Sequence, residues 1–261
     1  MVYTSKEHII SSLKKGVRLD GRKPLEFRPI TIETGFISTA EGSARVKVGD
    51  TEVLAGVKMA VGKPYSDTPD RGVLMVNAEL LSISNPDFEQ GPPSIESIEV
   101  ARVIDRGVRE SKTIDDHALC IRAGELVWMV NVDLCPLNTD GNMIDVGALA
   151  AIAALKSTRY PSMDGDKVVY GKPTDVRLPV GGIPIPVTIV KIGDTLLVDP
   201  SDDEFKTADA RLTVTTMEDG RLCAMQKGGD AALSLEEVSQ MLDLASEKAE
   251  ELRELLKKAI R

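Results

Sequence analysis

The hydrophobic pattern changes its period along the chain, and these changes outline the expected elements. Between residues 30 and 59 apolar and polar positions alternate, which predicts strands joined by a tight turn at Gly49-Asp50. Apolar residues at helical spacing predict one helix near residues 94–111 and a second, rich in small side chains, near 144–155. This order of strands and helices indicates an α+β fold, with mixed sheets packed against helices.

Both ends of the chain are expected to be helical. Thr4 and Glu7 have the spacing of a capping box, and the apolar face of the helix behind them comprises Ile9, Ile10, Leu13 and Val17. Ser234 and Glu237 form a similar box before a long helix, whose apolar stripe comprises Leu235, Val238, Met241, Leu242, Ala245, Leu252 and Leu256. Further strands are expected at residues 73–81, 118–122 and 126–134.

An internal echo suggests that the chain has two related halves. The segment KVGDTEVL at residues 47–54 and the segment KIGDTLLV at residues 191–198 share Lys, Gly, Asp and Thr at matched positions. Both an old duplication and the chance recurrence of common turn residues explain this echo. The polar residues 157–175 predict an irregular boundary. We therefore expect an N-terminal helix and basic arm at 1–27, a first half at 28–160 and a second half at 176–261.

The charge balance limits the classes of function. The 261 residues carry a net charge of −9, which counts against a free-standing, electrostatically driven nucleic-acid binder. A local basic patch remains compatible, and the first 30 residues hold seven Lys or Arg against three Asp or Glu. The longest apolar run, residues 146–155, is too short to span a bilayer, and no signal peptide is recognisable. These features predict a cytoplasmic protein without membrane contact.

Conventional catalytic groups are scarce. With only two histidines, the chain offers no recognisable nucleophile–base pair. Three widely spaced cysteines predict reduced, buried side chains and no disulfide; they are Cys120, Cys135 and Cys223. One carboxylate cluster follows a predicted strand and comprises Asp199, Asp202, Asp203 and Glu204. Such a cluster is compatible with a Mg²⁺ site, but its residues are also ordinary in turns and helix caps, which favours a solvated acidic turn.

A stripe of arginines is the second candidate feature. Arg102, Arg106 and Arg109 lie within one face of the helix predicted near residues 94–111, opposite its apolar side. Guanidinium groups so arranged suit phosphate binding, because each presents a planar fork of donors. The alternative is ion pairing on a solvated face with the nearby acids Glu99, Asp105 and Glu110. The spacing alone favours neither.

Several segments together resemble the RNase PH superfamily over nearly the whole chain. These are RLDGR at 18–22, EGSARVKVGDTEVLAGVKM at 41–59, the helix near 94–111 and the VDPSDDE segment. The segments DTPDRGVLMVNAELL and GNMIDVGALAAIAAL look most similar to one group, the non-catalytic RNase PH-like subunit of the archaeal exosome core. The resemblance implies an RNase PH-like fold with two βαβ-type halves. It also implies a hexameric ring of three heterodimers with a catalytic RNase PH-like subunit, RNA-binding cap proteins and single-stranded RNA.

The chain departs from the pattern of active family members at three places. Those members carry two aspartates six residues apart, whereas here Asp199 is followed by Phe205. Their phosphate-binding arginines and Gly-Thr/Ser-Arg loop are replaced by Pro92-Pro93-Ser94 and by Asp140-Gly141-Asn142-Met143. Phenylalanine neither binds Mg²⁺ nor carries a proton. We therefore expect no catalytic residue, metal or cofactor in this subunit, with Mg²⁺ and inorganic phosphate at the partner's site.

The resemblance also assigns a role to the arginine stripe. The positions that match Arg102 and Arg106 face RNA near the partner's active site in this group, and Arg109 is the weaker candidate beside them. The expected function is thus a non-catalytic, RNA-binding subunit of a 3′→5′ phosphorolytic exoribonuclease complex that shapes the partner's site. Two alternatives stay open: an active phosphorolytic exoribonuclease that uses Asp203 or Glu204 as its second acid, and a pure scaffold without RNA contact.

Overall fold

The first of two main sheets is built from the N-terminal half of the chain. The computed structural model describes residues 6–260. The strands of this sheet are β1 (Ile30–Thr34), β2 (Gly42–Val48), β3 (Thr51–Gly62), β4 (Val73–Ala78), β5 (Cys120–Arg122) and β6 (Leu126–Asn138). Their order is β1-β2-β3-β6-β4, with β5 paired to β6, and only β4 runs parallel to its neighbour. In β3 every second side chain is buried, as the alternating sequence predicts.

The second sheet comes from the C-terminal half and is entirely antiparallel. It comprises β9 (Ile185–Ile192), β10 (Thr195–Val198), β11 (Ala210–Thr216) and β12 (Leu222–Gly228), in the order β10-β9-β11-β12. The echoed segments form equivalent hairpins, β2–β3 and β9–β10. In each, the first turn residue is a glycine with φ near +57°, at Gly49 and Gly193. Glycine adopts this backbone conformation without steric cost.

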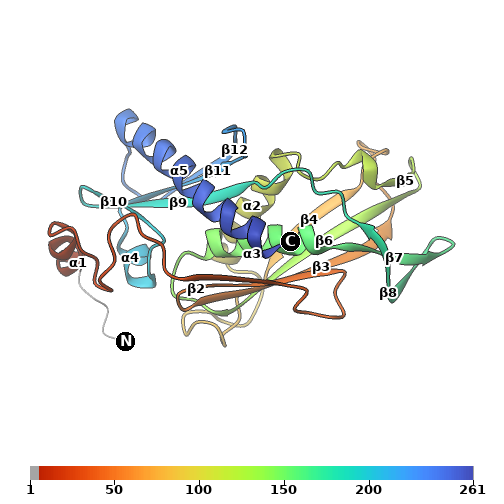
Figure 1. The fold of residues 1–261 in the computed structure, drawn as a ribbon, viewed down its shortest axis with the longest axis horizontal. Helices are drawn as coiled ribbons and strands as arrows, with labels where there is room; N and C mark the ends of the chain where they lie inside the picture. Colours follow the sequence, from red (N-terminus) through yellow and green to blue (C-terminus); the bar gives the residue numbers. More distant parts are fainter. Residues whose placement is uncertain (1–5, 261) are drawn as a thin grey trace.

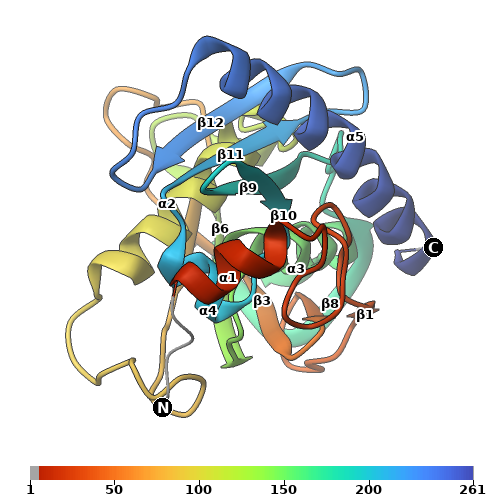
Figure 2. The same cartoon turned by 90° about the vertical axis from the view of Figure 1, so that its left-hand side faces the viewer.

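Two helices fill the space between the sheets (Figures 1 and 2). They are α2 (Ile95–Glu110), which contacts β4 and β12, and α3 (Met143–Ser157), which contacts β2, β3 and β9. Every residue of α3 from 143 to 155 is buried. Its glycine and alanines let both sheets approach closely, which explains why the helix is rich in small residues. The expected α+β architecture with helices packed on sheets is confirmed.

Three further helices complete the fold. The long α5 (Leu235–Ala259) packs along β9 and β11, and the short α4 (Asp202–Thr207) follows β10. Near the N-terminus, α1 (Lys6–Leu13) buries Ile9 and Leu13 against residues of β9 and β10. The first and second halves therefore share one packed body, and the N-terminal helix closes one end of it (Figure 2). No helix within residues 6–260 is long and apolar enough to cross a membrane.

Residues 157–175, the expected boundary between the two halves, are not irregular. This segment forms a hairpin of β7 (Arg159–Asp164) and β8 (Lys167–Arg177), which extends beyond the first sheet (Figure 1). Its polar sequence conceals the hairpin because most of β8 is exposed. A few contacts hold it: the ring centroids of Tyr160 and Trp128 lie 5.2 Å apart, and Lys58 Nζ lies 3.9 Å from the ring centre of Tyr170.

Smaller expectations also need correction. Val17 lies beyond the end of α1 and is exposed, and Leu235 is exposed at the first turn of α5. Residues 117–119 form a 3₁₀ turn before the short β5. The cysteines are unpaired as expected, but all three are only half-buried. The Thr4–Glu7 capping box lies partly outside the described residues.

Candidate nucleic-acid interface

Helix α2 holds the arginine stripe on a fixed frame. Pro92 and Pro93 precede the helix, and the Ser94 hydroxyl accepts a hydrogen bond from the Ser97 amide at 3.1 Å. Its buried face packs toward α3 and the sheets through Val100, Val103, Ile104, Gly107 and Val108. Burial of that face turns the three arginines of the stripe outward, as their spacing predicts.

The three arginines differ in what they contact. Arg109 donates to the Asp105 carboxylate at 2.6 and 2.9 Å and to the Leu74 carbonyl at 2.8 Å. Within residues 6–260, neither Arg102 nor Arg106 makes an ion pair or a hydrogen bond through its exposed guanidinium. The alternative of pairing along the helix thus describes Arg109 alone. The stripe leaves two adjacent cationic groups available for an anion.

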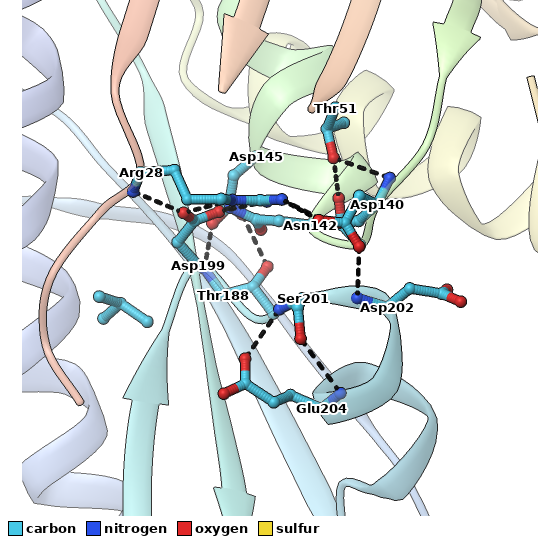
Figure 3. A network of polar contacts seen from close by, with 12 residues as sticks. Arg28, Thr51, Asp140, Asn142, Asp145, Thr188, Asp199, Ser201, Asp202 and Glu204 are labelled. Carbon is cyan, nitrogen blue, oxygen red and sulfur yellow. Dashed lines mark hydrogen bonds and ion pairs between the residues drawn. The ribbon is translucent and has the colours of Figure 1, made fainter. Parts of the chain in front are cut away.

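Asp199, the one retained acid of the family pattern, lies at the centre of a buried ionic cluster (Figure 3). Its carboxylate accepts hydrogen bonds from Arg28 Nε at 2.9 Å and Nη2 at 2.8 Å, from Arg22 Nη1 at 2.8 Å, and from Asn142 Nδ2 at 2.8 Å. The side chain is fully buried. Burial alone would raise the pKa of Asp199, but the hydrogen bonds and charge of Arg28, together with Arg22, outweigh it and lower the pKa.

A second buried ion pair holds Glu204, the acid five residues after Asp199. Arg18 is buried and pairs with Glu204, while its Nη1 and Nη2 donate to the carbonyls of Val198 at 2.9 Å and Asp199 at 2.7 Å. Glu204 also accepts from the Ser201 amide at 2.8 Å, which completes the capping box of α4 (Figure 3). Glu204 is therefore committed to local structure on both sides.

The residues at this position do not fit a magnesium ion. The oxygens of Asp199 are already surrounded by guanidinium groups, and Phe205 offers no ligand atom where active family members have their second acid. Phe205 is half-buried and has Arg211 at 5.1 Å from its ring centre. Within residues 6–260, no three His, Cys, Asp or Glu side chains are placed to hold a metal ion. We derive no metal-dependent step for this chain.

The loop before α3 carries an acid and a strained residue. Arg28 Nη1 lies 3.0 Å from the Asp140 carboxylate, and Asn142 has a left-handed backbone with φ of 56°. One turn into α3, the buried Asp145 accepts hydrogen bonds from the Thr188 amide at 2.9 Å and from its hydroxyl at 2.7 Å. Burial raises the pKa of Asp145 to about 7, although the hydrogen bonds from Thr188 lower it. A carboxylate at Asp140 makes this loop unsuited to an incoming anion.

Comparison with known proteins places the chain in a family. The models of the 3′ exoribonuclease family match residues 26–161 with domain 1 and residues 182–248 with domain 2. The chain belongs to the RNase PH family. The matched domains contain both sheets, and the site around Asp199 lies where the N-terminal arm, the loop before α3 and the second domain meet.

Individual proteins that are similar to this chain identify a group within the RNase PH family. The exosome complex component Rrp42 of Methanocella arvoryzae is 48% identical over 96% of this chain and 95% of its own length. That of Thermoplasma acidophilum is 48% identical, covering 95% of this chain and 94% of its own. A chain of the Archaeoglobus fulgidus exosome, solved with RNA bound to the active site, superposes with a TM-score of 0.89 at 47% identity, covering 95% and 96% of the two chains. The expected resemblance to the archaeal exosome core is confirmed.

Sequence reasoning missed the partners of the retained acid. Arg18, Arg22 and Arg28 belong to the basic N-terminal segment, and their excess of positive charge was the available signal. Nothing in the sequence joins that segment to a site more than 170 residues away. The structure brings Asp199 and Glu204 beside these arginines, while Arg102, Arg106 and Arg109 lie apart on α2.

Proposed function

We propose that this chain is a non-catalytic, RNA-binding structural subunit of a 3′→5′ phosphorolytic exoribonuclease complex. The observation that carries this proposal is the pair of exposed guanidinium groups, Arg102 and Arg106, which pair with no acid among residues 6–260 of this otherwise acidic protein. Such groups suit the RNA backbone, because contacts to phosphates position a strand without reading its sequence. Arg109 assists less, since Asp105 already engages it.

The assembly in which the chain acts is part of the proposal. By similarity to archaeal exosome core proteins, the chain joins a catalytic RNase PH-like subunit in a cytoplasmic ring of three heterodimers, on which RNA-binding cap proteins sit. The net charge of −9 disfavours RNA binding by the isolated chain, and confinement of the RNA inside a ring removes this obstacle. Mg²⁺ and inorganic phosphate would then act at the partner's site, which this chain helps to shape.

The proposed lack of catalytic activity in this subunit is based on the contacts of its two carboxylates, Asp199 and Glu204. Asp199 is held by two arginines and an amide, and Glu204 is held by Arg18 and its own capping box. Carboxylates surrounded in this way have no coordination position left for a metal. The lowered pKa of Asp199 also leaves this group without a proton to exchange at neutral pH. The nearby Phe205 supplies neither function.

The deciding experiment measures RNA affinity of the reconstituted ring that carries Arg102→Ala and Arg106→Ala. One charge-assisted phosphate contact contributes on the order of 1.5–3 kcal/mol, so each lost contact should weaken binding by about tenfold to a hundredfold. Light scattering confirms that the ring remains assembled. Arg109→Ala is the matched variant on the same helix, and we expect a smaller loss because its guanidinium is already paired.

Other outcomes of this experiment separate the alternatives. Unchanged affinity in an intact ring would make the subunit a pure scaffold. The possibility of an active enzyme is tested on the isolated chain with Mg²⁺, phosphate and oligoadenylate, where we expect no release of nucleoside diphosphates. Robust phosphorolysis by this chain alone would overturn the non-catalytic assignment.

A further inference from the structure

A small cavity lies beside the altered site, on the side away from the N-terminal arm. It has a volume of about 70 Å³ and is bounded by the first turns of α2 and α3, by α4 and by the loop around Phe88. It opens into a wider groove under residues 78–97, with which it shares Asp87, Phe88 and Glu96. In the RNase PH family pattern the corresponding region of active members serves an anion, so its charge here decides what it accepts.

The charges around the cavity favour a cation. Four acids line it, namely Asp87, Glu96, Glu99 and Asp202, against two bases, Lys206 and Arg211. Both bases are paired: Lys206 lies 2.5 Å from Asp87 and 2.7 Å from Asp202, and Arg211 lies 2.5 Å from Glu99. Within residues 6–260, Glu96 has no ion pair, and the groove adds Glu79 and Glu89 without a further base. The unbalanced carboxylates repel phosphate and attract a positively charged group.

Within residues 6–260, a buried hydrogen-bond acceptor without a partner also favours a ligand that donates hydrogen bonds. Asn142 lines the cavity and is only 3% exposed. Its Nδ2 donates to Asp199 at 2.8 Å, which fixes the orientation of the amide, and its Oδ1 accepts no hydrogen bond from any residue of the described chain. A buried acceptor left unsatisfied costs free energy, and an N–H or O–H donor brought to it relieves that cost. A phosphodiester or an ionised carboxylate brings only acceptors, and inorganic phosphate, which keeps an O–H group, also brings a negative charge that the surrounding acids repel.

The side chains that line the cavity and the groove indicate that the ligand also has an apolar part. Phe88, Val100, Met143 and Phe205 give the cavity apolar sides, which suit the methylene stem or the flat face of a guanidinium. Two exposed apolar side chains line the groove, Ile95 at 87% and Leu81 at 38% exposure. Exposed apolar side chains that lie together mark a surface for protein contact, and a free ion would not need them.

We propose that this cavity receives an arginine or lysine side chain of a protein partner, and that RNA does not enter it. The loss of the phosphate-binding pattern has then produced a cation-binding pocket beside α2, on the same helix as the RNA-facing arginines. For the identity of the partner the proposal rests on the proposed function, which supplies the catalytic RNase PH-like subunit.

The test uses Glu96→Lys, with Glu236→Lys at the corresponding position of α5 as the control. Glu96 and Glu236 are both exposed, both follow a serine N-cap by two residues, and both come after an exposed apolar residue. Both substitutions therefore remove one acid from a helix N-terminus, but only Glu96 borders the cavity. Calorimetry should show Glu96→Lys weakening association with the catalytic subunit by about tenfold or more, and Glu236→Lys by less than about twofold. Equal losses for the two variants would overturn the docking role.

A second measurement reports on the cavity without the partner. N-acetyl-arginine amide, titrated into the full chain, should shift the amide resonances of Asn142, Met143 and Phe205, and Glu96→Lys should abolish these shifts. Shifts of these residues by inorganic phosphate or oligoadenylate instead would overturn the proposal. If the wild-type chain fails to bind the catalytic subunit, the proposed function is wrong, whereas the arginine-amide titration still decides the chemistry of the cavity.

Discussion

At the scale of single residues, the surroundings of a side chain decide its chemistry. Asp199 has a left-handed backbone with φ of 47° and no solvent exposure, and its oxygens face Arg22, Arg28 and Asn142. An aspartate with open coordination positions can serve a metal, whereas here every oxygen already accepts hydrogen bonds from this chain. Asp199 therefore anchors the N-terminal arm to the second domain.

Asp199→Asn tests this anchoring. Removal of the Asp199 charge leaves Arg28 and Arg22 with only the more exposed Asp140 and Asp20 as partners, and costs up to about 3–5 kcal/mol. Urea denaturation of the isolated chain should show this loss, while Asp243→Asn, an exposed position on α5, should change the free energy of unfolding little. In rings that do assemble, the degradation rate should stay within about threefold, because the chemistry belongs to the partner. A hundredfold loss of rate in intact rings would show that Asp199 acts in the reaction.

Asp145 gives a pH-dependent prediction of opposite sign to that of an ordinary carboxylate. Its pKa of about 7 in the folded chain lies above the value near 4 expected when unfolded, so folding takes up a proton between these pH values. Its contribution to stability is thus present at low pH and is lost as the pH rises through about 7. Asp145→Asn mimics the protonated acid beside Thr188 and should remove this loss.

Urea unfolding at pH 5 and pH 8 measures the effect. The wild-type chain should lose stability over this interval by up to about 1.4 kcal/mol per pH unit from Asp145, and the asparagine variant should have a correspondingly flatter profile. Parallel profiles for the two proteins would contradict a raised pKa at this position.

At the scale of elements, the two echoed hairpins show how similar local sequences acquire different tertiary roles. A Cβ atom added at Gly49 would lie 2.3 Å from Cδ of Arg28, whereas one added at Gly193 would meet only Ile10 at 3.8 Å or more. Both glycines have nearly the same φ, so the backbone cost of a side chain is the same in the two turns. The turn of β2–β3 thus packs against an arginine of the ionic cluster, whereas the turn of β9–β10 packs against Ile10 of α1.

Substitution of Gly49 or Gly193 by alanine tests whether the two turns contribute differently to stability. Gly193→Ala should cost about 1–2 kcal/mol from the left-handed backbone alone. Gly49→Ala should cost at least about 1 kcal/mol more, because Arg28 must move and its ion pair with Asp199 is disturbed. The two urea midpoints are compared directly, and equal losses would show that Arg28 adjusts without weakening the cluster.

At the scale of the whole molecule, an acidic protein presents on α2 two arginines that have no ion pair within the described part of the chain, residues 6–260. Electrostatic attraction by the whole chain cannot account for RNA binding when the net charge is −9. Local contacts at Arg102 and Arg106 can, provided that an assembly brings the RNA to α2. The salt dependence of binding distinguishes such local phosphate contacts from other sources of affinity.

The ring with Arg102→Ala and Arg106→Ala should bind RNA with a shallower salt dependence. Each phosphate contact to a single strand adds about 0.7 to the slope of log affinity against log salt, so the loss of two should reduce the slope by about 1.4. Oligoadenylate and mixed sequences should be affected alike, since phosphates carry no sequence information. An unchanged slope, or a defect confined to one sequence, would contradict backbone contacts by these arginines.

The sequence by itself determined most of the elements and the outward arginine face. Alternation in β3, capping residues before α2 and α5, and glycine in both echoed turns act over a few residues, so they predict structure without knowledge of the fold. The β7–β8 hairpin escaped prediction because it is largely exposed and lacks the apolar pattern that marks most strands. Comparison with the family pattern also identified Phe205 as a departure, because the sequence alone shows that this side chain has no atom able to bind a metal.

Tertiary structure alone decided how the altered site is used. Pairing of Arg28 with Asp199 joins residues 171 positions apart, and the local sequence around either residue carries no trace of the other. The same applies to the choice between free and paired arginines on α2, since Asp105 reaches Arg109 while Glu99 turns to Arg211 from β11. Local patterns set which groups are available, but the fold sets which charges meet, because ionic contacts act through space between elements that the packing brings together.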